Sequence, residues 1–443
     1  MLDGRLSGLD VAFLCLEGER TPMHMGAVVT FEPGGPVDTE RLTLLLAARA
    51  ARIPQLRKHI RPTLLPPGGA VWVDDPGFDP AAHIHLHHVS SLYEPDPLAA
   101  FASLWIAEPL DMSRPLWDLC LVTGLPGGRF AVLLKLHHAL ADGAGAFTIG
   151  SGLLDELPGA RAVRATSPRP AEARPARGAL GLLKDGVSTV FTQAAEGASI
   201  ASSMLRAARP YPASPISAPD ADERSLGFVR LDLADLRRVR KAHGGTTNDV
   251  LLAIVAGALR DWLINRGHRA DDRTLRALIP VSVRARHPGS TDGNQLSGYL
   301  CDLPIGLTDP VARLRAVRRS MHHAKAQGTA TGPGAFGVLA NRLPAPVHRL
   351  ATRAAGRAAP LLFDTVVTNV PMPSGPLTLD GARLREIYPL VPLPPHQALG
   401  IAISLYRDSV HIGLQANGEA VADLGSLRDA FAKSTATLAD TCA

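Results

Sequence analysis

The order of apolar and polar residues predicts both strands and helices in the first part of the chain. Gly26–Phe31 and Phe130–Leu136 are short apolar runs rich in branched side chains, so each is predicted to be a strand. Between Asp38 and Ile53 apolar residues recur at helical spacing, with Asp38 or Thr39 as a candidate N-cap. Pro54 ends this predicted helix, because proline cannot continue the hydrogen-bond ladder.

The second half of the chain carries a similar mixture of elements. Strands are predicted at six segments: Phe228–Leu233, Leu275–Val283, Gly298–Pro304, Asp364–Val370, Ala398–Leu405 and Ser409–Gln415. Helices are predicted at four others: Asp235–Ala242, Thr247–Arg266, Pro310–Ala326 and a last one between Gly418 and the end. Strands and helices in both halves favour an α+β fold built from two similar units.

A change in composition separates the two halves. Residues Pro158–Gly178 are mainly Pro, Arg and Ala, with hardly any large apolar side chain, which is typical of a solvated linker. A helix is expected next, at about Leu180–Ala208. The predicted organisation has three parts: an N-terminal unit at 1–157, a linker and connecting helix at 158–224, and a C-terminal unit at 225–443.

Composition narrows the class of protein. The 443 residues are 46% hydrophobic and 20% charged, which excludes a disordered or fibrous chain. No apolar stretch approaches the roughly 18 residues of a spanning helix, and the N-terminus lacks signal-peptide features, so a cytoplasmic protein is expected. The four cysteines have no CxxC spacing, which indicates neither a zinc site nor a disulfide framework.

The charge balance gives information about partners. Lys and Arg total 46 against 41 Asp and Glu, a net charge of +5, which is mild for this length. No cluster of basic residues with interleaved aromatics is present, so nucleic acid is not an expected partner. Attraction to an anionic lipid surface or to an acidic substrate remains open.

The strongest candidate for chemistry is a vicinal histidine pair, His137-His138, followed by Asp142-Gly143. It comes directly after the predicted strand Phe130–Leu136, so a rigid element holds it. A neutral imidazole with an ordinary pKa near 6.5 is suited to taking a proton from a hydroxyl, which contributes about 10²–10⁴-fold in rate. Asp142 can contact the imidazole or anchor the turn, and Gly143 is expected to adopt a positive φ.

The histidine pair has two other interpretations. A single histidine beside an apolar strand is most often structural, although a vicinal pair followed by Asp and Gly is much rarer. Zinc binding by both rings is disfavoured, because adjacent residues on a strand point to opposite faces. By the same argument only one of His137 and His138 faces a substrate. No GxSxG nucleophile motif is present, so the base is expected to activate the substrate's own hydroxyl or amine.

The histidine segment has the form HHxxxDG, and the chain resembles the bacterial wax ester synthase/acyl-CoA:diacylglycerol acyltransferase family. This family belongs to the superfamily of CoA-dependent acyltransferases and peptide condensation domains. HHxxxDG alone is shared by the superfamily, whereas further segments in order indicate the lipid family. These segments are Ser7–Phe13, Thr21–Gly26, Pro115-Leu116-Trp117, Thr247–Val250, Gly293-Asn294 and Thr368–Pro371.

The resemblance implies two chloramphenicol-acetyltransferase-like units with a channel between them. It implies transfer of a long-chain acyl group from acyl-CoA to diacylglycerol or a long-chain alcohol, with no metal or cofactor and with acyl-CoA as a substrate. The general base maps to His138, within a catalytic motif that includes His137, Asp142 and Gly143. Asp142 is an anchor that often pairs with an arginine in the superfamily, and the segment 52–57, with Arg at both ends, is the candidate source.

Further positions map to substrate binding, and each has a structural alternative. Asn248 and Asp249 shape the active-site wall across from His138 or cap the helix that follows them. Asn369 lines a tunnel or occupies a turn. The PLW segment, Pro115-Leu116-Trp117, either contacts the acyl chain or packs in the core.

The partners implied are acyl-CoA and a lipid hydroxyl acceptor, with peripheral association at the inner membrane face or at lipid droplets. The helix at Leu180–Ala208 either lies in the bilayer interface or packs on the protein. Met372 stands where the family commonly has glycine, which leaves substrate preference open. Two alternative functions remain: an acyltransferase of the same fold acting on a non-storage acceptor, and a non-catalytic lipid-binding protein.

Overall fold

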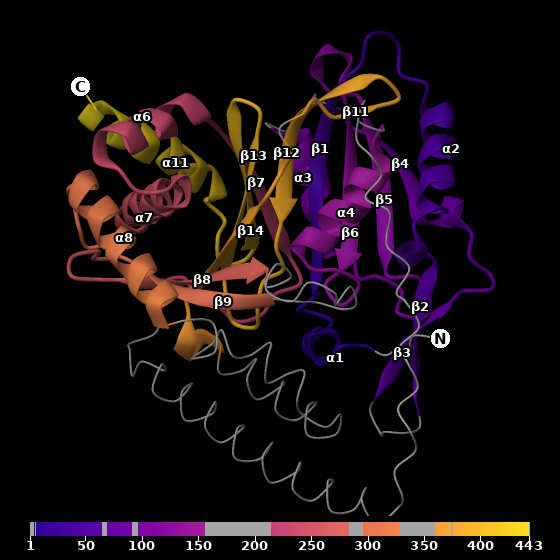
Figure 1. Ribbon diagram of the computed structural model, residues 1–443, viewed down its shortest axis with the longest axis horizontal. Coiled ribbons are helices and arrows are strands. Elements are labelled where there is room, and N and C mark those ends of the chain that lie inside the picture. Colours follow the sequence, from indigo (N-terminus) through magenta and orange to yellow (C-terminus); the bar gives the residue numbers. More distant parts are fainter. Residues whose placement is uncertain are drawn as a thin grey trace, which may run out of the picture.

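The computed structural model describes residue 4 and residues 6–63, 69–90, 96–155, 214–282, 296–327, 359–373 and 375–442. The predicted linker Pro158–Gly178, the predicted helix Leu180–Ala208 and the Gly293-Asn294 pair lie outside these residues. Within them, two six-stranded sheets lie side by side, each with helices on its outer face (Figure 1). This arrangement confirms the α+β class expected from the sequence.

The first sheet is formed mostly by the N-terminal part of the chain. Its strands, in spatial order, are β11 (Thr378–Leu379), β12 (Ala382–Leu390), β1 (His24–Glu32), β6 (Phe130–His137), β5 (Trp117–Thr123) and β4 (Ile84–His88). A separate hairpin pairs β2 (Lys58–Pro62) with β3 (Ala70–Asp74). All eight residues of β6 are buried, which agrees with the near-continuous apolar run in its sequence.

Helices cover both faces of this sheet. On the outer face lie α2 (Thr39–Ala50) and α4 (Gly143–Leu153), whose apolar residues share one core with alternate residues of β5 and β6. On the inner face lies α3 (Pro97–Ala107), which shares a second core with the remaining residues of those strands. A short helix, α1 (Gly8–Leu16), precedes β1.

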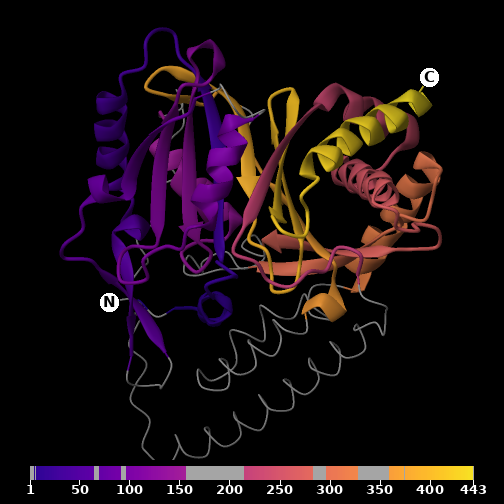
Figure 2. The same cartoon turned by 180° about the vertical axis from the view of Figure 1, so that it is seen from behind.

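The second sheet belongs to the C-terminal part. Its strands, in order, are β7 (Arg224–Asp232), β14 (Ser409–Asn417), β13 (Leu399–Tyr406), β10 (Thr365–Val370), β8 (Leu275–Ser282) and β9 (Leu296–Leu303). Four helices cover its outer face: α6 (Leu233–His243), α7 (Thr247–Asn265), α8 (Pro310–Gln327) and α11 (Leu424–Ala439). Figure 2 shows these helices on the side away from the first sheet.

The strand β12 crosses from the C-terminal part into the first sheet. It pairs antiparallel with β1, with Gly26 opposite Leu390. β12 also contacts β13 and β14 of the second sheet. Ser404 Oγ donates to the carbonyl of Ile387 at 2.6 Å, and Gly413 has no room for a side chain against the Pro389 backbone. The predicted C-terminal unit, 225–443, therefore does not fold entirely in one sheet, because its residues 378–390 complete the N-terminal one.

Local sequence signals explain the element ends that position the site. Asp38 caps α2 by accepting from the Arg41 amide at 3.0 Å, as predicted, and α2 ends before Pro54. The predicted strands Gly26–Phe31 and Phe130–Leu136 are confirmed as β1 and β6. Short 3₁₀ turns occur at Pro54–Arg57, Pro80–His83, Pro126–Gly128 and Asp440–Cys442. Among the described residues, no helix is both long and apolar enough to cross a bilayer.

Candidate active site

The histidine pair lies where β6 ends. His137 is the last residue of β6 and pairs with His24 of the neighbouring strand β1. His138 begins the loop that leads to Asp142, and α4 starts at Gly143. His137 and Asp142 are completely buried, and only 8% of His138 is exposed. A rigid strand end thus holds the HHxxxDG segment in the interior of the N-terminal part.

Asp142 is the N-cap of α4. Its carboxylate accepts from the amide of Gly145 at 2.8 Å, and its carbonyl accepts from Ala146 at 2.7 Å. This capping fits the interpretation of Asp142 as an anchor of the turn. The positive φ expected for Gly143 is wrong: Gly143 is already the first residue of the helix, and it does not belong to the glycines with left-handed backbone. The space beside it is open, since an added Cβ meets no atom within 4 Å.

The imidazole of His138 is covered by an aromatic ring. Phe13 of α1 stacks on it, with ring centroids 3.9 Å apart and planes within 15° of parallel. The backbone amide of His138 donates to the carbonyl of Met23 at 2.9 Å. Burial lowers the pKa of His138 to about 4, and the neighbouring His137 acts in the same direction. The ring is therefore neutral at physiological pH and can accept a proton.

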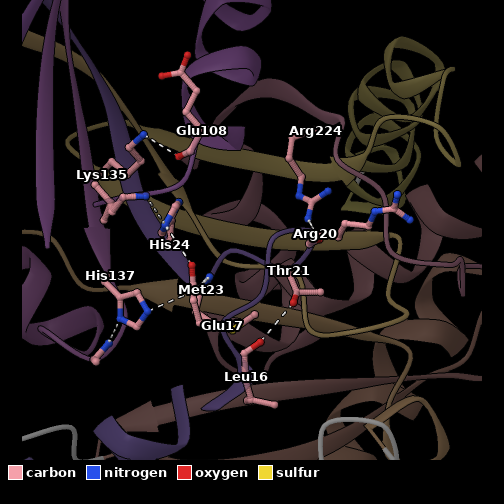
Figure 3. Close-up of polar contacts among 12 residues, drawn as sticks. Leu16, Glu17, Arg20, Thr21, Met23, His24, Glu108, Lys135, His137 and Arg224 are labelled. Atoms are coloured by element: carbon pink, nitrogen blue, oxygen red, sulfur yellow. Dashed lines mark hydrogen bonds and ion pairs between the residues drawn. The ribbon is translucent and has the colours of Figure 1, made fainter. Parts of the chain in front are cut away.

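A partly buried carboxylate, Glu17, lies beside His137 and Met23 (Figure 3). Its Oε2 accepts from the Met23 amide at 2.5 Å and lies 3.3 Å from His137 Nε2, while its Oε1 lies 3.8 Å from His24 Nε2. Burial raises the pKa of Glu17, but the contacts with His137, the Met23 amide and His24 outweigh it and leave the pKa below its usual value. The group is thus an anion at neutral pH.

The other ring nitrogen of His137 is also engaged. The amide of Ala139 donates to His137 Nδ1 at 3.0 Å, so this nitrogen carries no proton when the ring is neutral. The proton then lies on Nε2, the nitrogen nearest Glu17. The sequence predicts that only one of the two histidines faces a substrate, and these contacts direct both ring nitrogens of His137 toward groups of the protein.

Two further buried polar residues, His24 and Lys135, lie near the histidine pair. Burial lowers the pKa of His24 to about 4. Lys135 of β6 is buried, and its ammonium donates to the carbonyls of Trp105 and Glu108 at 2.9 and 3.0 Å, at the end of α3. Burial likewise lowers the pKa of Lys135. These contacts join the end of α3 to β6, and Figure 3 shows Lys135 pointing toward Glu108.

The Asn248-Asp249 pair lies at the start of α7, in the C-terminal part. Thr246 is the N-cap, and it forms a capping box with Asp249: the Thr246 amide donates to Asp249 Oδ2 at 2.8 Å, and the Asp249 amide donates to Thr246 Oγ1 at 3.2 Å. Asp249 thus caps the helix, as its structural alternative predicted. A substrate contact at either residue stays a prediction.

The PLW segment leads into β5. The carbonyl of Leu116 accepts from the His137 amide at 3.0 Å, so the segment contacts the histidine motif through its backbone. Trp117 is fully buried; its Nε1 donates to the Leu56 carbonyl at 2.8 Å, and its ring stacks on His83. These contacts favour the packing interpretation of Leu116 and Trp117.

Two expectations concern residues farther from the histidines. Asn369 is an exposed residue within β10, next to Ile403 of β13, so it occupies a strand and not a turn. Arg52 and Arg57, the ends of the candidate arginine segment, are both exposed, whereas Asp142 is buried. An arginine partner for Asp142, and the channel between the two parts, stay predictions.

Sequence reasoning missed Glu17 and Phe13 as site residues. Phe13 ends the segment Ser7–Phe13 that carries part of the family resemblance, and Glu17 lies between that segment and Thr21–Gly26, but neither residue has a local pattern that points to chemistry. Glu17 is one of two acids, with Glu19, in the segment between an apolar helix and a strand that begins with a histidine, and its partner His137 lies 120 positions farther along the chain. Nothing in this local pattern distinguishes Glu17 from Glu19.

The two-sheet architecture, with HHxxxDG at the end of an inner strand, defines a protein of the CoA-dependent acyltransferase class. The sequence profile of the wax ester synthase/diacylglycerol acyltransferase catalytic domain matches residues 6–251, and that of the WS/DGAT C-terminal domain matches residues 292–439. The chain therefore belongs to the wax ester synthase/diacylglycerol acyltransferase family, and it is an acyltransferase.

Individual relatives agree with this assignment. A probable diacylglycerol O-acyltransferase of Mycobacterium tuberculosis is 32% identical over 435 residues, covering 95% of this chain and 93% of the relative. A wax ester synthase/diacylglycerol acyltransferase from Marinobacter aquaeolei VT8 has a similar fold, with a TM-score of 0.72 at 24% identity over 99% of both chains. The starter condensation domain of rhizomide synthetase, solved with C8-CoA and Leu-SNAC, has a TM-score of 0.57 at 16% identity, covering 99% of this chain and 95% of that domain.

Proposed function

We propose that the protein transfers a long-chain acyl group from acyl-CoA to the hydroxyl of diacylglycerol or of a long-chain alcohol, with His138 as the general base. The observation that carries the proposal is the neutral imidazole of His138 at the end of β6, on a residue whose main-chain amide donates to the Met23 carbonyl. The relatives named as diacylglycerol O-acyltransferases support the substrate class.

The chemistry needs one base and no protein nucleophile. The His138 imidazole takes the proton of the acceptor hydroxyl while the oxygen attacks the thioester carbonyl. A tetrahedral oxyanion forms, and its collapse breaks the carbon–sulfur bond. The CoA thiolate leaves and receives the proton from the imidazolium, so the ring returns to its neutral form and the products are an ester and free CoA.

Access to the ring sets a steric condition on this reaction. Phe13 covers one face of the imidazole, and only 8% of His138 is exposed. The acceptor hydroxyl must therefore approach the uncovered edge or displace Phe13. A site that admits little water favours transfer to a lipid alcohol over hydrolysis of the thioester.

The donor assignment has separate support. The rhizomide condensation domain has a similar fold and was solved with an acyl-CoA. We infer that acyl-CoA is also the donor here. Because both substrates carry long apolar chains and the net charge is +5, we further propose peripheral association with a membrane surface or lipid droplets.

The test offers the purified protein palmitoyl-CoA with diacylglycerol, with a fatty alcohol, with a sugar-lipid or polyketide alcohol, or with no acceptor, and follows free thiol together with ester product. Acceptor-dependent thiol release with matching ester formation supports the proposal. Equal thiol release without an acceptor identifies a thioesterase and contradicts it. Transfer to neither lipid, but to a sugar-lipid or polyketide hydroxyl, identifies an acyltransferase for a non-storage acceptor.

A further inference from the structure

The segment between α1 and β1 is tied to the backbone of the proposed base through a single residue. The amide of Met23 donates to Glu17 Oε2 at 2.5 Å, and the carbonyl of Met23 accepts from the His138 amide at 2.9 Å. Met23 therefore links the carboxylate to the main chain of His138. The hydrogen bond from Glu17 thus fixes the residue that accepts from the His138 amide, directly before β1.

A second link runs from the same carboxylate through the first histidine. Glu17 Oε2 lies 3.3 Å from His137 Nε2, and His137 Nδ1 accepts from the Ala139 amide at 3.0 Å. A carboxylate attracts the nitrogen that bears the proton, so it favours the tautomer in which Nδ1 can accept. The Ala139 amide belongs to the residue directly after His138, so the two links hold the main chain on both sides of the base.

The position of Glu17 on α1 adds a third constraint. The Glu17 amide donates to the Phe13 carbonyl at 3.0 Å and ends the helix, while the Phe13 ring stacks on His138. The anchoring of Glu17 against Met23 and His137 therefore also fixes the end of the helix that covers the imidazole. Only 16% of the Glu17 side chain is exposed.

We propose that Glu17 is a positioning residue for the acyl transfer reaction: together with the Ala139 amide it holds His137 in the Nε2-protonated form, and it orients His138 through Met23 and Ala139, without contacting substrate. This inference rests on the proposed function of His138 as the base. His137, the first histidine of the motif, then has a positioning role. Glu17 holds the His137 ring, and the His137 ring holds the Ala139 amide in the loop that follows His138.

The test compares Glu17→Gln with Glu19→Gln, the same chemical change at an exposed acid two positions along. Acyl transfer from palmitoyl-CoA gives kcat and KM, and long-range ¹H–¹⁵N spectra of the imidazoles report the His137 tautomer, with assignment from a His137→Gln variant. Glu17→Gln is expected to lower kcat by about 10-fold or more with an unchanged KM for acyl-CoA, since a base in the wrong orientation loses much of its effect. Glu19→Gln keeps both constants.

The imidazole spectra and the double variant separate positioning from general structural damage. In Glu17→Gln the Ala139 amide still favours the proton on Nε2, but the Nε2 signals of His137 shift because the carboxylate that faces this nitrogen is gone. Adding Glu17→Gln to His137→Gln lowers kcat little further, because the two residues act in series. Unchanged kcat in Glu17→Gln, unchanged His137 signals, or fully additive losses overturn the inference. If Glu17→Gln does not fold, Glu17→Asp is measured instead. The shorter aspartate side chain cannot reach both Met23 and His137, so kcat is expected to fall. A wild-type kcat in Glu17→Asp overturns the inference.

A His138→Ala variant measured in parallel distinguishes failure of the positioning role of Glu17 from failure of the assignment of His138 as the base. If His138→Ala is inactive while Glu17→Gln keeps its wild-type kcat, only the positioning role fails. If His138→Ala keeps full activity, the base assignment fails and the positioning role fails with it.

Discussion

The ring of Phe13 lies face to face with the imidazole of His138, 3.9 Å between centroids. Because this cover excludes water, it helps to keep the pKa of His138 near 4. A protonated ring cannot act as a base, so kcat/KM is expected to stay level from pH 8 to about pH 5 and to fall as the pH approaches 4. Phe13→Ala admits water to the ring, and the acid limb of the profile is expected to move toward pH 6.5.

The measurement is the pH dependence of initial acyl transfer rates at constant ionic strength, with samples returned to pH 7.5 to exclude denaturation. Phe101→Ala provides the matched control, because Phe101 stacks on His87, a histidine outside the site, with centroids 3.6 Å apart. This variant keeps the wild-type profile. A wild-type acid limb already near pH 6.5, or one that Phe13→Ala leaves unmoved, contradicts the role of the stack.

Asp142 caps α4, and its removal leaves the Gly145 amide without its acceptor. Asp142→Ala is expected to lower the free energy of unfolding by about 1–2 kcal/mol, with a smaller loss for Asp142→Asn, since asparagine is also a good N-cap. Chemical denaturation measures both. Asp38→Ala removes the equivalent cap of α2 and is expected to cost similar stability without loss of activity. Equal stability of Asp142→Ala and the wild type is the contrary result.

Trp117, the first residue of β5, is buried in the core, and its indole N–H donates to the Leu56 carbonyl. Trp117→Phe leaves that buried carbonyl unpaired, so the free energy of unfolding is expected to fall by about 1–3 kcal/mol. KM for acyl-CoA should not change, because the side chain is fully enclosed by protein. Trp72→Phe, in the half-buried strand β3, provides a milder comparison. A raised KM with unchanged stability indicates an acyl-chain contact instead.

His411 is buried between the two sheets, with its ring against Tyr388 of β12. Neither ring nitrogen has a hydrogen-bond partner among the residues that the structure describes. Burial lowers the pKa of His411 to about 4, and the nearby Arg230 acts in the same direction. The unfolded chain therefore binds a proton between about pH 6.5 and pH 4 that the folded chain does not, and stability falls as the pH falls through this window.

His411→Phe removes that proton uptake while keeping an aromatic ring against Tyr388. The loss of unfolding free energy between pH 7.5 and pH 5 is expected to shrink by on the order of 2 kcal/mol. His85→Phe, at a half-exposed histidine, keeps the wild-type slope. His24 and His138 have pKa values lowered in the same direction, so part of the slope persists. An unchanged slope in His411→Phe contradicts this account.

The sequence predicts those elements whose determinants are neighbouring residues. The strand at Phe130–Leu136 and the helix capped by Asp38 appear as predicted, because a strand buried on both faces is a continuous apolar run and a helix cap directly precedes its helix. The same holds for HHxxxDG, which lies within seven positions. β12 was missed, since its charged residues Arg383, Arg385 and Glu386 hide its alternation and its partner β1 lies about 350 positions away.

The contacts around the histidines depend on distant parts of the chain for the same reason. Glu17 meets His137 only once β1 and β6 have paired, and Phe13 reaches His138 only once α1 has packed against the strand ends. Gly143 shows the converse error, in which a local rule was applied to a glycine that simply starts a helix. Nonlocal packing, and not residue type, decides which side chains meet at this site.

If His138 removes the proton from the acceptor hydroxyl, its loss lowers the rate of acceptor-dependent CoA release. His138→Ala is compared with His85→Ala, a histidine outside the site, and palmitoyl-CoA binding is measured by calorimetry in each. We expect a loss of about 10²–10⁴-fold in the release rate of His138→Ala with retained binding, and wild-type release in His85→Ala. Equal release rates in all three proteins contradict this role of His138.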